Sequence, residues 1–334
     1  MNVLDILLPA GVLGGMGVLF GAGLAFASKK LAVPVDERVE KVRECLPGAG
    51  CGACGYTGCD SYAAAVVNEG APVNCCPVGG EKAAQAIAAI MGVEAGESTR
   101  MVATVLCQGD SDHCKTKYTY EGLMECRAMF LTSGGDKACK YACLGLGSCA
   151  RVCEFGAITI HDRLVSVDPD KCKGCGKCIE VCPKSVLRLE PYGLLSTLRC
   201  RAVEKGKAVR DACSAGCISC GKCARGCKFG AIEMKDNLPQ IDHDKCVGCM
   251  NCADSCPTGA IRANESLRRV ALLHVNKCTG CDECRKVCPF EAIQGEPDQM
   301  HNVISWNCKG CGKCVEVCQS GALELIPTVK HNNN

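Results

Sequence analysis

The chain has 334 residues, of which 35 are cysteine and only 4% are aromatic. A chain of this length usually forms two or three domains, but so few aromatic side chains limit a conventional hydrophobic core. The formal net charge of +2 gives no indication of nucleic-acid binding. Abundant cysteine is typical of disulfide scaffolds in secreted proteins. Tandem Cys-x2-Cys pairs like those found here instead need reduced thiolates, which places them in a reducing compartment.

The N-terminal region is apolar. Residues 6–27 contain no charged side chain, and about 20 apolar residues can cross a bilayer as a helix. We therefore expect a single transmembrane anchor over 1–30. Lys29 and Lys30 follow the apolar stretch, whereas only Asp5 precedes it. By the positive-inside rule, the remainder of the chain is expected on the cytoplasmic side of the cell membrane.

The same region has two further interpretations. The small residues Gly11 and Gly15, like Gly17 and Gly21, have the spacing of a helix-packing face, although incidental glycines in a simple anchor would look the same. A cleaved signal peptide is disfavoured because no basic residue precedes the apolar stretch.

Residues 31–100 contain three closely spaced cysteines and a more distant adjacent pair, which suits one [4Fe-4S] cluster. The expected ligands are Cys51, Cys54, Cys59 and Cys76. Cys75 is an alternative to Cys76. Ala-rich stretches at 61–68 and 81–92 predict helices in this small domain.

The second half of the chain repeats the Cys-x2-Cys-x2-Cys-x3-Cys spacing of bacterial ferredoxins, which is strong evidence for [4Fe-4S] clusters. Four regular runs begin at Cys172, Cys246, Cys278 and Cys308. Two less regular runs precede the first two of them. Together they predict ferredoxin-like βαββαβ two-cluster modules at 139–190, 213–263 and 264–334, joined by connectors at 101–138 and 191–212. The expected fold class is α+β.

In two-cluster ferredoxins the fourth cysteine of each run binds the cluster of the other run. The expected sets in the second and third modules are Cys217, Cys220, Cys223 with Cys256; Cys246, Cys249, Cys252 with Cys227; Cys278, Cys281, Cys284 with Cys318; and Cys308, Cys311, Cys314 with Cys288.

The first module lacks one ligand, because Leu146 occupies the place of a cysteine. We expect Cys139 to replace it. The two sets are then Cys139, Cys143, Cys149 with Cys182, and Cys172, Cys175, Cys178 with Cys153. The alternative is a three-iron cluster held by Cys143, Cys149 and Cys182 alone.

These predictions amount to seven [4Fe-4S] clusters, using 28 of the 35 cysteines. The cysteines without an assigned role are Cys45, Cys75, Cys107, Cys114, Cys126, Cys200 and Cys213. Cys107, Cys114 and Cys126 could help to build an eighth cluster with Cys139. The slightly favoured alternative is that they are free buried thiols.

Other chemistries have less support in the sequence. Zinc also binds Cys-x2-Cys pairs, but none of the six histidines is spaced into these runs. The spacing of Cys213, Cys217 and Cys220 matches a radical-SAM triad, but no barrel-sized domain follows it. No dinucleotide fingerprint and no candidate catalytic residue is found, so the redox chemistry is assigned to the clusters.

The order of these parts, with the segments Cys51–Cys59 and Cys143–Cys149, resembles the B subunit of the Rnf complex over nearly the whole chain. The resemblance implies a component of a membrane ferredoxin:NAD oxidoreductase, a translocase that pumps Na+ or H+. Such a component accepts electrons from soluble ferredoxin and passes them to partner subunits that hold flavins and the NAD site. The extra modules exceed the minimal two-cluster form.

Two further hypotheses remain at this stage. A membrane-anchored polyferredoxin could serve another redox complex, such as a hydrogenase. A structural zinc-ribbon array could mediate protein interaction, and its metal content would distinguish it.

Overall fold

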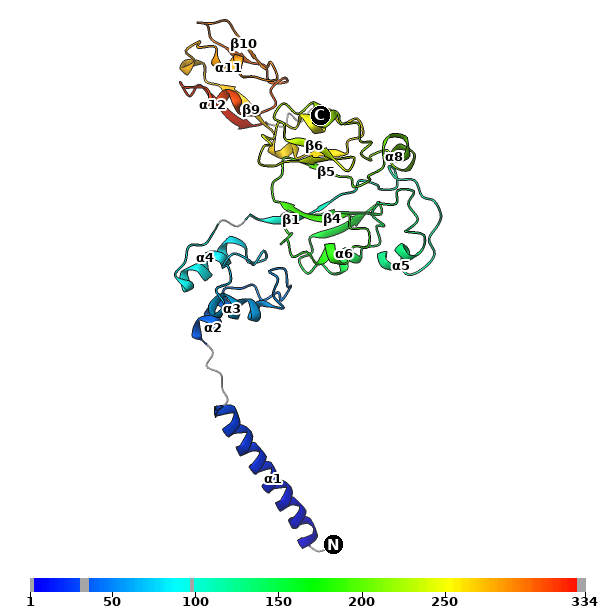
Figure 1. Cartoon of the computed structure of the whole chain (residues 1–334), viewed down its shortest axis with the longest axis vertical. Coiled ribbons are helices and arrows are strands. Elements are labelled where there is room, and N and C mark those ends of the chain that lie inside the picture. Colours follow the sequence, from blue (N-terminus) through cyan, green and yellow to red (C-terminus); the bar gives the residue numbers. More distant parts are fainter. Residues whose placement is uncertain (1–2, 31–35, 97–98, 329–334) are drawn as a thin grey trace. The chain divides into compact units, whose positions relative to one another are not determined.

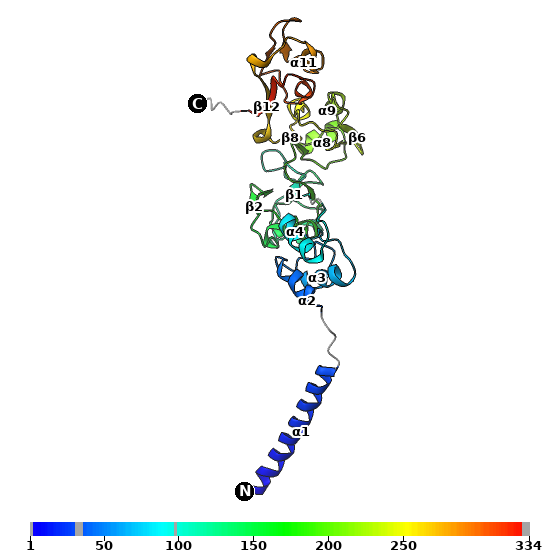
Figure 2. The same cartoon turned by 90° about the vertical axis from the view of Figure 1, so that its left-hand side faces the viewer.

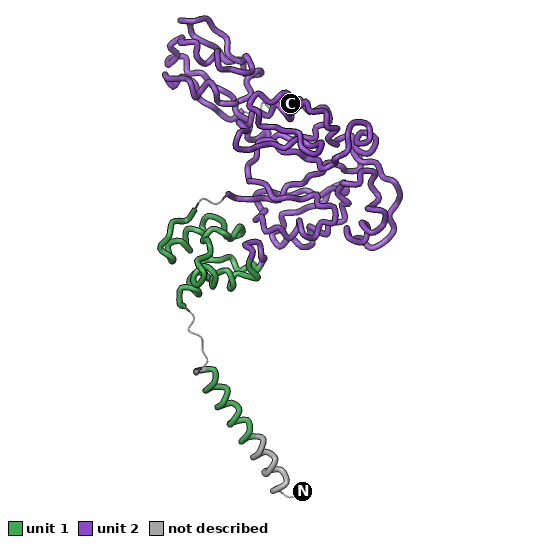
Figure 3. Tube along the Cα trace, viewed as in Figure 1, with its two compact units in different colours: residues 1–50, 56–96 green, residues 51–55, 97–334 purple. Residues whose placement is uncertain are grey.

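The computed structural model describes residues 3–30, 36–96 and 99–328. The chain divides into two compact units (Figure 3). The first unit comprises Met1–Gly50 and Tyr56–Gly96, and the second comprises Cys51–Gly55 and Glu97–Asn334.

Helix α1 (Val3–Lys30) is continuous over the apolar N-terminal stretch (Figure 1). Its large apolar side chains are exposed, with Leu19 at 74% and Phe20 at 66% of their full accessible surface. Within the part of the chain that the structure describes, no helix is both long and apolar enough to cross a membrane. The side chains at 1–13, which belong to the predicted anchor, lie outside that part.

Three further helices form the first unit: α2 (Glu37–Glu44), α3 (Cys59–Asn68) and α4 (Gly80–Met91). The two predicted Ala-rich helices are therefore confirmed. Helix α2 begins where the Asp36 carboxylate accepts a hydrogen bond from the amide of Arg38 at 2.9 Å. Small side chains let the helices pack closely around a few larger ones, Tyr62 and Ile87 among them.

The second unit contains three modules that follow one another along the chain (Figures 1 and 2). Each has an antiparallel pair made of its first and last strands and a separate hairpin between them. A short helix lies within each cysteine run, so the order is the βαββαβ order that the repeats predict.

The first module has the strand pair β1 (Met101–Val105) with β4 (Leu187–Pro191), the hairpin β2 (Ile158–His161) with β3 (Leu164–Val167), and helices α5 (Cys126–Leu131), α6 (Ser148–Arg151) and α7 (Lys177–Glu180). The second has the pair β5 (Ser196–Leu198) with β8 (Ile261–Ala263), the hairpin β6 (Ile232–Lys235) with β7 (Leu238–Ile241), and helices α8 (Gly206–Ala212), α9 (Lys222–Arg225) and α10 (Asn251–Asp254). The third has the pair β9 (Arg269–Leu273) with β12 (Leu323–Pro327), the hairpin β10 (Ile293–Gln294) with β11 (Asn302–Val303), helices α11 (Glu283–Lys286) and α12 (Lys313–Glu316), and the 3-10 turns η1 (Glu265–Leu267) and η2 (Val275–Lys277).

The hairpin turns explain two of these strand pairs. Asp162 and Arg163 both have positive φ angles, 43° and 55°, and so do Asp236 and Asn237 at 49° and 64°. Two consecutive left-handed residues make the type of turn whose twist matches a tight hairpin, and Asp and Asn tolerate that conformation well. The turns set the register in which β2 pairs with β3 and β6 with β7.

The predicted module boundaries were too narrow at their N-terminal sides. Strand β1 lies in the range 101–138 and β5 in the range 191–212, both of which were expected to be connectors. Because neither strand carries a cysteine, the repeat pattern did not reveal them. Each nevertheless closes its module by pairing with the last strand.

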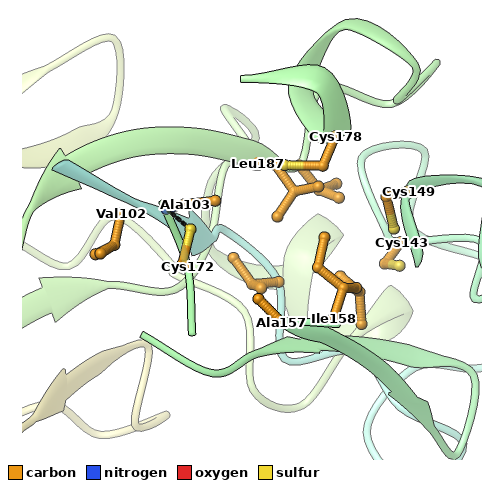
Figure 4. Close-up of a cluster of buried hydrophobic side chains, with 12 residues drawn as sticks. Val102, Ala103, Cys143, Cys149, Ala157, Ile158, Cys172, Cys178 and Leu187 are labelled. Carbon is orange, nitrogen blue, oxygen red and sulfur yellow. Dashed lines mark hydrogen bonds between the residues drawn. The ribbon is translucent and has the colours of Figure 1, made fainter. Parts of the chain in front are cut away.

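The cysteines themselves form part of the module cores. In the first module Cys143, Cys149, Cys172 and Cys178 belong to one buried cluster with Ile158 and other apolar residues. Figure 4 shows this cluster around the strands of the module. The scarcity of aromatic residues is thus partly offset by buried cysteine side chains.

Candidate iron–sulfur cluster sites

Each cysteine run includes a loop in which two residues adopt the left-handed conformation. In the run that begins at Cys172 these residues are Gly174 (φ 67°) and Gly176 (φ 81°). A Cβ on Gly174 would lie 2.5 Å from the carbonyl oxygen of Met101, so only glycine permits this approach. The loop thereby wraps tightly enough for closely spaced cysteines to face the same point.

The run that begins at Cys308 contributes to a well-defined cavity in the third module. This cavity has a volume of about 340 Å³ and is lined by Cys308, Cys311, Cys314 and Cys288. We call it the Cys308 site. It brings together the four cysteines predicted as one ligand set, including Cys288, which belongs to the other run.

An equivalent cavity lies in the second module. It has a volume of about 330 Å³ and is lined by Cys217, Cys220, Cys223 and Cys256. We call it the Cys217 site. Here too the structure brings together the predicted set, with Cys256 crossing from the second run.

Two more sets, and three of the four members of another, are brought together, and each site is named after the first cysteine of its run. At the Cys172 site, Cys178 interacts with Cys172, Cys175 and Cys153. At the Cys246 site, Cys249 interacts with Cys227 and Cys246, and Cys252 with Cys249. At the Cys278 site, Cys284 interacts with Cys278 and Cys281. Cys318, the fourth residue predicted for this site, lies directly after α12.

The first module departs from the prediction. A cavity of about 350 Å³ is lined by Cys126, Cys143, Cys149 and Cys182, and we call it the Cys143 site. The cysteine that joins the predicted three is Cys126, at the start of α5, and not Cys139. The amide of Cys126 donates to the hydroxyl of Ser148 at 3.0 Å, which fixes this residue beside α6.

The assignment of Cys139 to this set is therefore wrong. Cys139 lines a different cavity, with Cys107, Cys200 and Cys213. Leu146, which replaces the missing ligand, packs instead against a small buried group that contains Cys126 and Met129. Four cysteines line the Cys143 site. The alternative of a three-iron cluster held by three cysteines is therefore not needed there. The sequence offered one signal for this replacement, because Cys126 had no assigned role in a segment expected to be a connector.

Burial affects these thiols strongly. Burial raises the pKa of Cys149 to about 12, and the thiolates of Cys143, Cys126 and Cys182 add to the rise. Burial likewise raises the pKa of Cys314 to about 12 at the Cys308 site. Thiolates this close together in an apolar environment repel one another, so they need bound cations to remain ionised. The chemistry of the donor sets fits iron–sulfur clusters.

Backbone amides point at several of the sulfurs. Ala103 in β1 donates to the Sγ of Cys172 at 3.3 Å, drawn as a dashed line in Figure 4. Ala271 in β9 donates to Cys308 at the same distance. Hydrogen bonds to sulfur are one of the means by which a protein adjusts the potential of an iron–sulfur cluster. The first strand of a module therefore contributes to a site although it carries no ligand.

The cysteines predicted for the N-terminal cluster are divided between the two units. Cys59 starts α3 and Cys76 precedes α4 in the first unit, whereas Cys51 and Cys54 belong to the second. Cys76 is buried, and its Sγ accepts a hydrogen bond from the amide of Gly79 at 3.3 Å. The amide of Cys75 donates to the hydroxyl of Tyr62.

Among the described residues, no three Cys, His, Asp or Glu side chains are placed to hold a single metal ion. A zinc ion needs its sulfur ligands about 2.3 Å from one centre. A four-iron cluster binds each thiolate at a different iron, so its ligands stand farther apart.

Sequence families of iron–sulfur proteins match most of the cysteine-rich part of the chain. The 4Fe-4S dicluster domain matches 216–260, 245–292 and 271–325, and the 4Fe-4S binding domain matches 165–188. An Fe-S cluster family matches 46–78. The chain thus carries several 4Fe-4S domains, and the Cys217 and Cys308 sites lie within the matched ranges.

Three curated relatives are similar over most of the chain. The B subunit of the Na+-translocating ferredoxin:NAD+ oxidoreductase complex of Acetobacterium woodii is 46% identical over 241 residues, which cover 72% of this chain and 72% of that protein. The B subunit of an ion-translocating oxidoreductase complex from Methanosarcina acetivorans is 41% identical, covering 70% of this chain and 89% of the relative. The B subunit of the proton-translocating ferredoxin:NAD+ oxidoreductase complex of Clostridium ljungdahlii is 41% identical, covering 68% and 81%. The chain therefore belongs to the family of Rnf complex B subunits.

Proposed function

We propose that this chain is the electron-transfer subunit of an ion-translocating ferredoxin:NAD oxidoreductase. In this role it accepts electrons from reduced ferredoxin and passes them to partner subunits, where the NAD site lies. The observation that carries the proposal is the succession of four-cysteine sites through the second unit. When bound, [4Fe-4S] clusters supply one-electron transfer over a wide range of potentials.

The cysteines of successive sites lie close to one another. Within the first module, Cys178 of the Cys172 site interacts with Cys149 of the Cys143 site. Within the third, Cys284 of the Cys278 site interacts with Cys314 of the Cys308 site. Between the second and third modules, Cys311 adds to the rise that burial causes in the pKa of Cys249. The sites therefore form an ordered series and not a scatter of separate centres.

The joint between the second and third modules is reinforced by charge and by aromatic contact. The Asp254 carboxylate pairs with Arg268 at 2.9 Å and with Lys309 at 2.8 Å. The rings of Phe229 and Phe290 lie 6.4 Å apart. These contacts hold the Cys246 and Cys308 sites in a constant relation, which a steady rate of electron transfer requires.

We assign the entry of electrons to the Cys278 site, at the C-terminal end of this series. Among the cysteines that the structure describes, Cys281 is exposed and the others are buried or half-buried. A soluble donor must bring its own cluster close to the first acceptor, and an exposed ligand allows that approach. The same end of the chain presents the exposed side chain of Trp306.

We also propose that α1 anchors the chain in the cell membrane, with both compact units on the cytoplasmic side. The exposed Leu19, Phe20 and Leu24 of α1 support this, because apolar side chains at such exposure favour a lipid or protein environment. Lys29 and Lys30 support the orientation. The other subunits of the complex are the expected partners of the helix.

An anaerobic titration of the full-length chain in detergent tests the proposed function. Reduced ferredoxin should rapidly bleach the visible absorbance and produce EPR signals of reduced [4Fe-4S] clusters, whereas NADH alone should not. Rapid reduction by NADH would overturn the assignment of the NAD site to a partner of this chain. Failure of ferredoxin to reduce an iron-loaded chain would favour a polyferredoxin that serves another redox complex.

A further inference from the structure

A fourth well-defined cavity lies where the first two modules meet, outside every predicted cluster set. It is lined by four cysteines, each from a different segment of the chain: Cys107, Cys139, Cys200 and Cys213. Cys107 follows β1, Cys200 follows β5, and Cys213 follows α8. Cys139 was assigned to another site, and Cys107 was named with it only in the alternative of an eighth cluster with Cys114 and Cys126. Cys200 and Cys213 had no assigned role.

This cavity matches the other cluster sites in size. Its volume is about 340 Å³, compared with about 340 Å³ at the Cys308 site and about 330 Å³ at the Cys217 site. Those two sites lie in ranges that match 4Fe-4S families. The four thiols are also close to one another, since Cys139 interacts with Cys107 and Cys200, and Cys213 with Cys107.

The backbone around these four cysteines follows one local rule. Each sulfur accepts a hydrogen bond from the amide two residues farther along the chain. The distances are 3.3 Å from Gly109 to Cys107 and 3.5 Å from Ala202 to Cys200. The backbones of Tyr141 and Ala215 interact in the same way with Cys139 and Cys213.

The same contact occurs in the cysteine runs of the ferredoxin modules, where the backbone of Lys313 interacts with Cys311 and that of Ser219 with Cys217. A turn of this kind folds the chain around the sulfur and directs an amide dipole at it. Free buried thiols have no need of four such turns that converge on one cavity.

Positive charge surrounds the cavity. Lys137 is only 3% exposed, and its ammonium donates to the carbonyl oxygens of Gly109 and Arg163. Arg199 and Arg201 contribute to the lining. Because four thiolates carry more negative charge than a [4Fe-4S] core neutralises, the buried ammonium of Lys137, whose charge acts on Cys107, would stabilise such a group in an apolar environment.

A fifth cysteine, Cys114, is adjacent but does not line the cavity. It pairs with Cys213 through an isolated strand bridge and is 1% exposed. It lies behind Gly109, where an added Cβ would be 3.0 Å from the Cβ of Cys114. The thiol of Cys114 interacts with that of Cys213, so the control must lie elsewhere: Cys45, at the end of α2, lines none of the four cavities.

We propose that Cys107, Cys139, Cys200 and Cys213 bind a further [4Fe-4S] cluster at this cavity, the Cys107 site. The segments expected to be connectors thus supply two of its four ligands, Cys107 and Cys200. No cysteine run marks the site, because its ligands are brought together by the fold and not by spacing along the chain.

The location of the site gives it a role that rests on the proposed function. The amide of Cys143, a residue of the Cys143 site, donates to the Sγ of Cys107 at 3.4 Å. On the other side, Cys200 interacts with Cys217 of the Cys217 site. The Cys107 site therefore links the first and second modules, and one electron at a time would pass between them through it.

Iron and acid-labile sulfide in the full-length chain, purified and loaded anaerobically, test the site directly. The wild type should hold about eight [4Fe-4S] clusters and not seven. Cys200→Ala and Cys213→Ala should each lose about four irons, or about one iron with a new [3Fe-4S] EPR signal if three ligands retain a partial cluster. Cys45→Ala should retain the wild-type content.

Two results would overturn the proposal. One is a wild-type content of about seven clusters. The other is an unchanged iron content and EPR spectrum in both Cys200→Ala and Cys213→Ala. The wild-type count needs no variant to fold, so the proposal remains testable if the variants are unstable. Since iron content is independent of ferredoxin, a chain with the predicted iron that ferredoxin fails to reduce would contradict the proposed function alone.

Discussion

In the first module Leu146 occupies the position of a ligand, and the distant Cys126 supplies the sulfur instead. The loop of the run that begins at Cys143 keeps both left-handed residues, Gly145 at φ 72° and Gly147 at φ 77°. The backbone therefore still curves around the site, although Leu146 provides no sulfur. Cys126 enters from α5, and the hydroxyl of Ser148 accepts a hydrogen bond from its amide. A loop shape can thus be kept while the ligand comes from elsewhere in the chain.

Replacing this cysteine should damage one cluster only. In Cys126→Ala we expect the Cys143 site to keep three ligands, so that the chain loses about one iron and gains a [3Fe-4S] EPR signal, or loses about four irons. Iron analysis and EPR measure this. Cys45→Ala is the control, because Cys45 lies at the end of α2 and lines none of the cavities described above. Loss of iron from the control but not from Cys126→Ala would contradict the assignment.

Asp282 should influence the potential at the proposed entry site. It follows the exposed Cys281, and its carboxylate accepts hydrogen bonds from Arg285 at 2.5 Å and from His301 at 2.9 Å. Arg285 first, and then His301, hold the pKa of Asp282 well below its usual range. An unpaired Asp has a pKa of about 3.9. The interactions of the Asp282 carboxylate therefore stabilise the folded chain fully above about pH 4, and this stabilisation is lost only as the pH falls further.

In Asp282→Asn a fixed negative charge near the Cys278 site is removed, which should favour the reduced, more negative cluster. We therefore expect a higher reduction potential at this site, by an amount that stays constant between pH 6 and 8. A redox titration followed by EPR measures it. Glu283→Gln is the matched control, since Glu283 pairs with Lys286 at the surface and is screened by solvent. An equal shift in both variants would refute a specific role for Asp282.

At the scale of elements, the sequence predicted the segments that contain cysteine runs and missed the strands that contain no cysteine. The spacing identified the runs, and Ala-rich composition identified α3 and α4. Strands β1 and β5 were missed because they have no ligand and no long alternation, and they become ordered only by pairing with β4 and β8. The Cys107 site was missed for a related reason: contacts between segments far apart in sequence bring its ligands together.

The short elements of the modules depend on the clusters. Helices α6, α7, α9, α10, α11 and α12 each have four residues. Isolated helices shorter than about 12 residues are marginal in water. We therefore expect that removing iron with a chelator under anaerobic conditions abolishes the hydrogen-exchange protection of the pairs β1–β4 and β9–β12. Helix α1, with 28 residues, should stay helical in detergent and serve as the internal control. Strands that remain protected without iron would show that the apolar cores suffice.

At the scale of the second unit, cysteines of neighbouring sites interact with one another at the joints between modules. Cys107 connects with Cys143, Cys200 with Cys217, and Cys249 with Cys311. In such a series, electrons that enter at one end must pass through the middle, so a defect there separates the two ends.

The whole-chain prediction follows from that series. If ferredoxin donates at the Cys278 site, then in Cys200→Ala the sites of the second and third modules should be reduced rapidly, and those of the first module should not. Freeze-quench EPR during reduction by ferredoxin measures the two groups, and Cys45→Ala should behave as the wild type. The reverse pattern would place ferredoxin at the first module. Rapid reduction of every remaining site would mean that the Cys107 site lies off the main route, because electrons would then have a path between the modules that avoids the four converging cysteines.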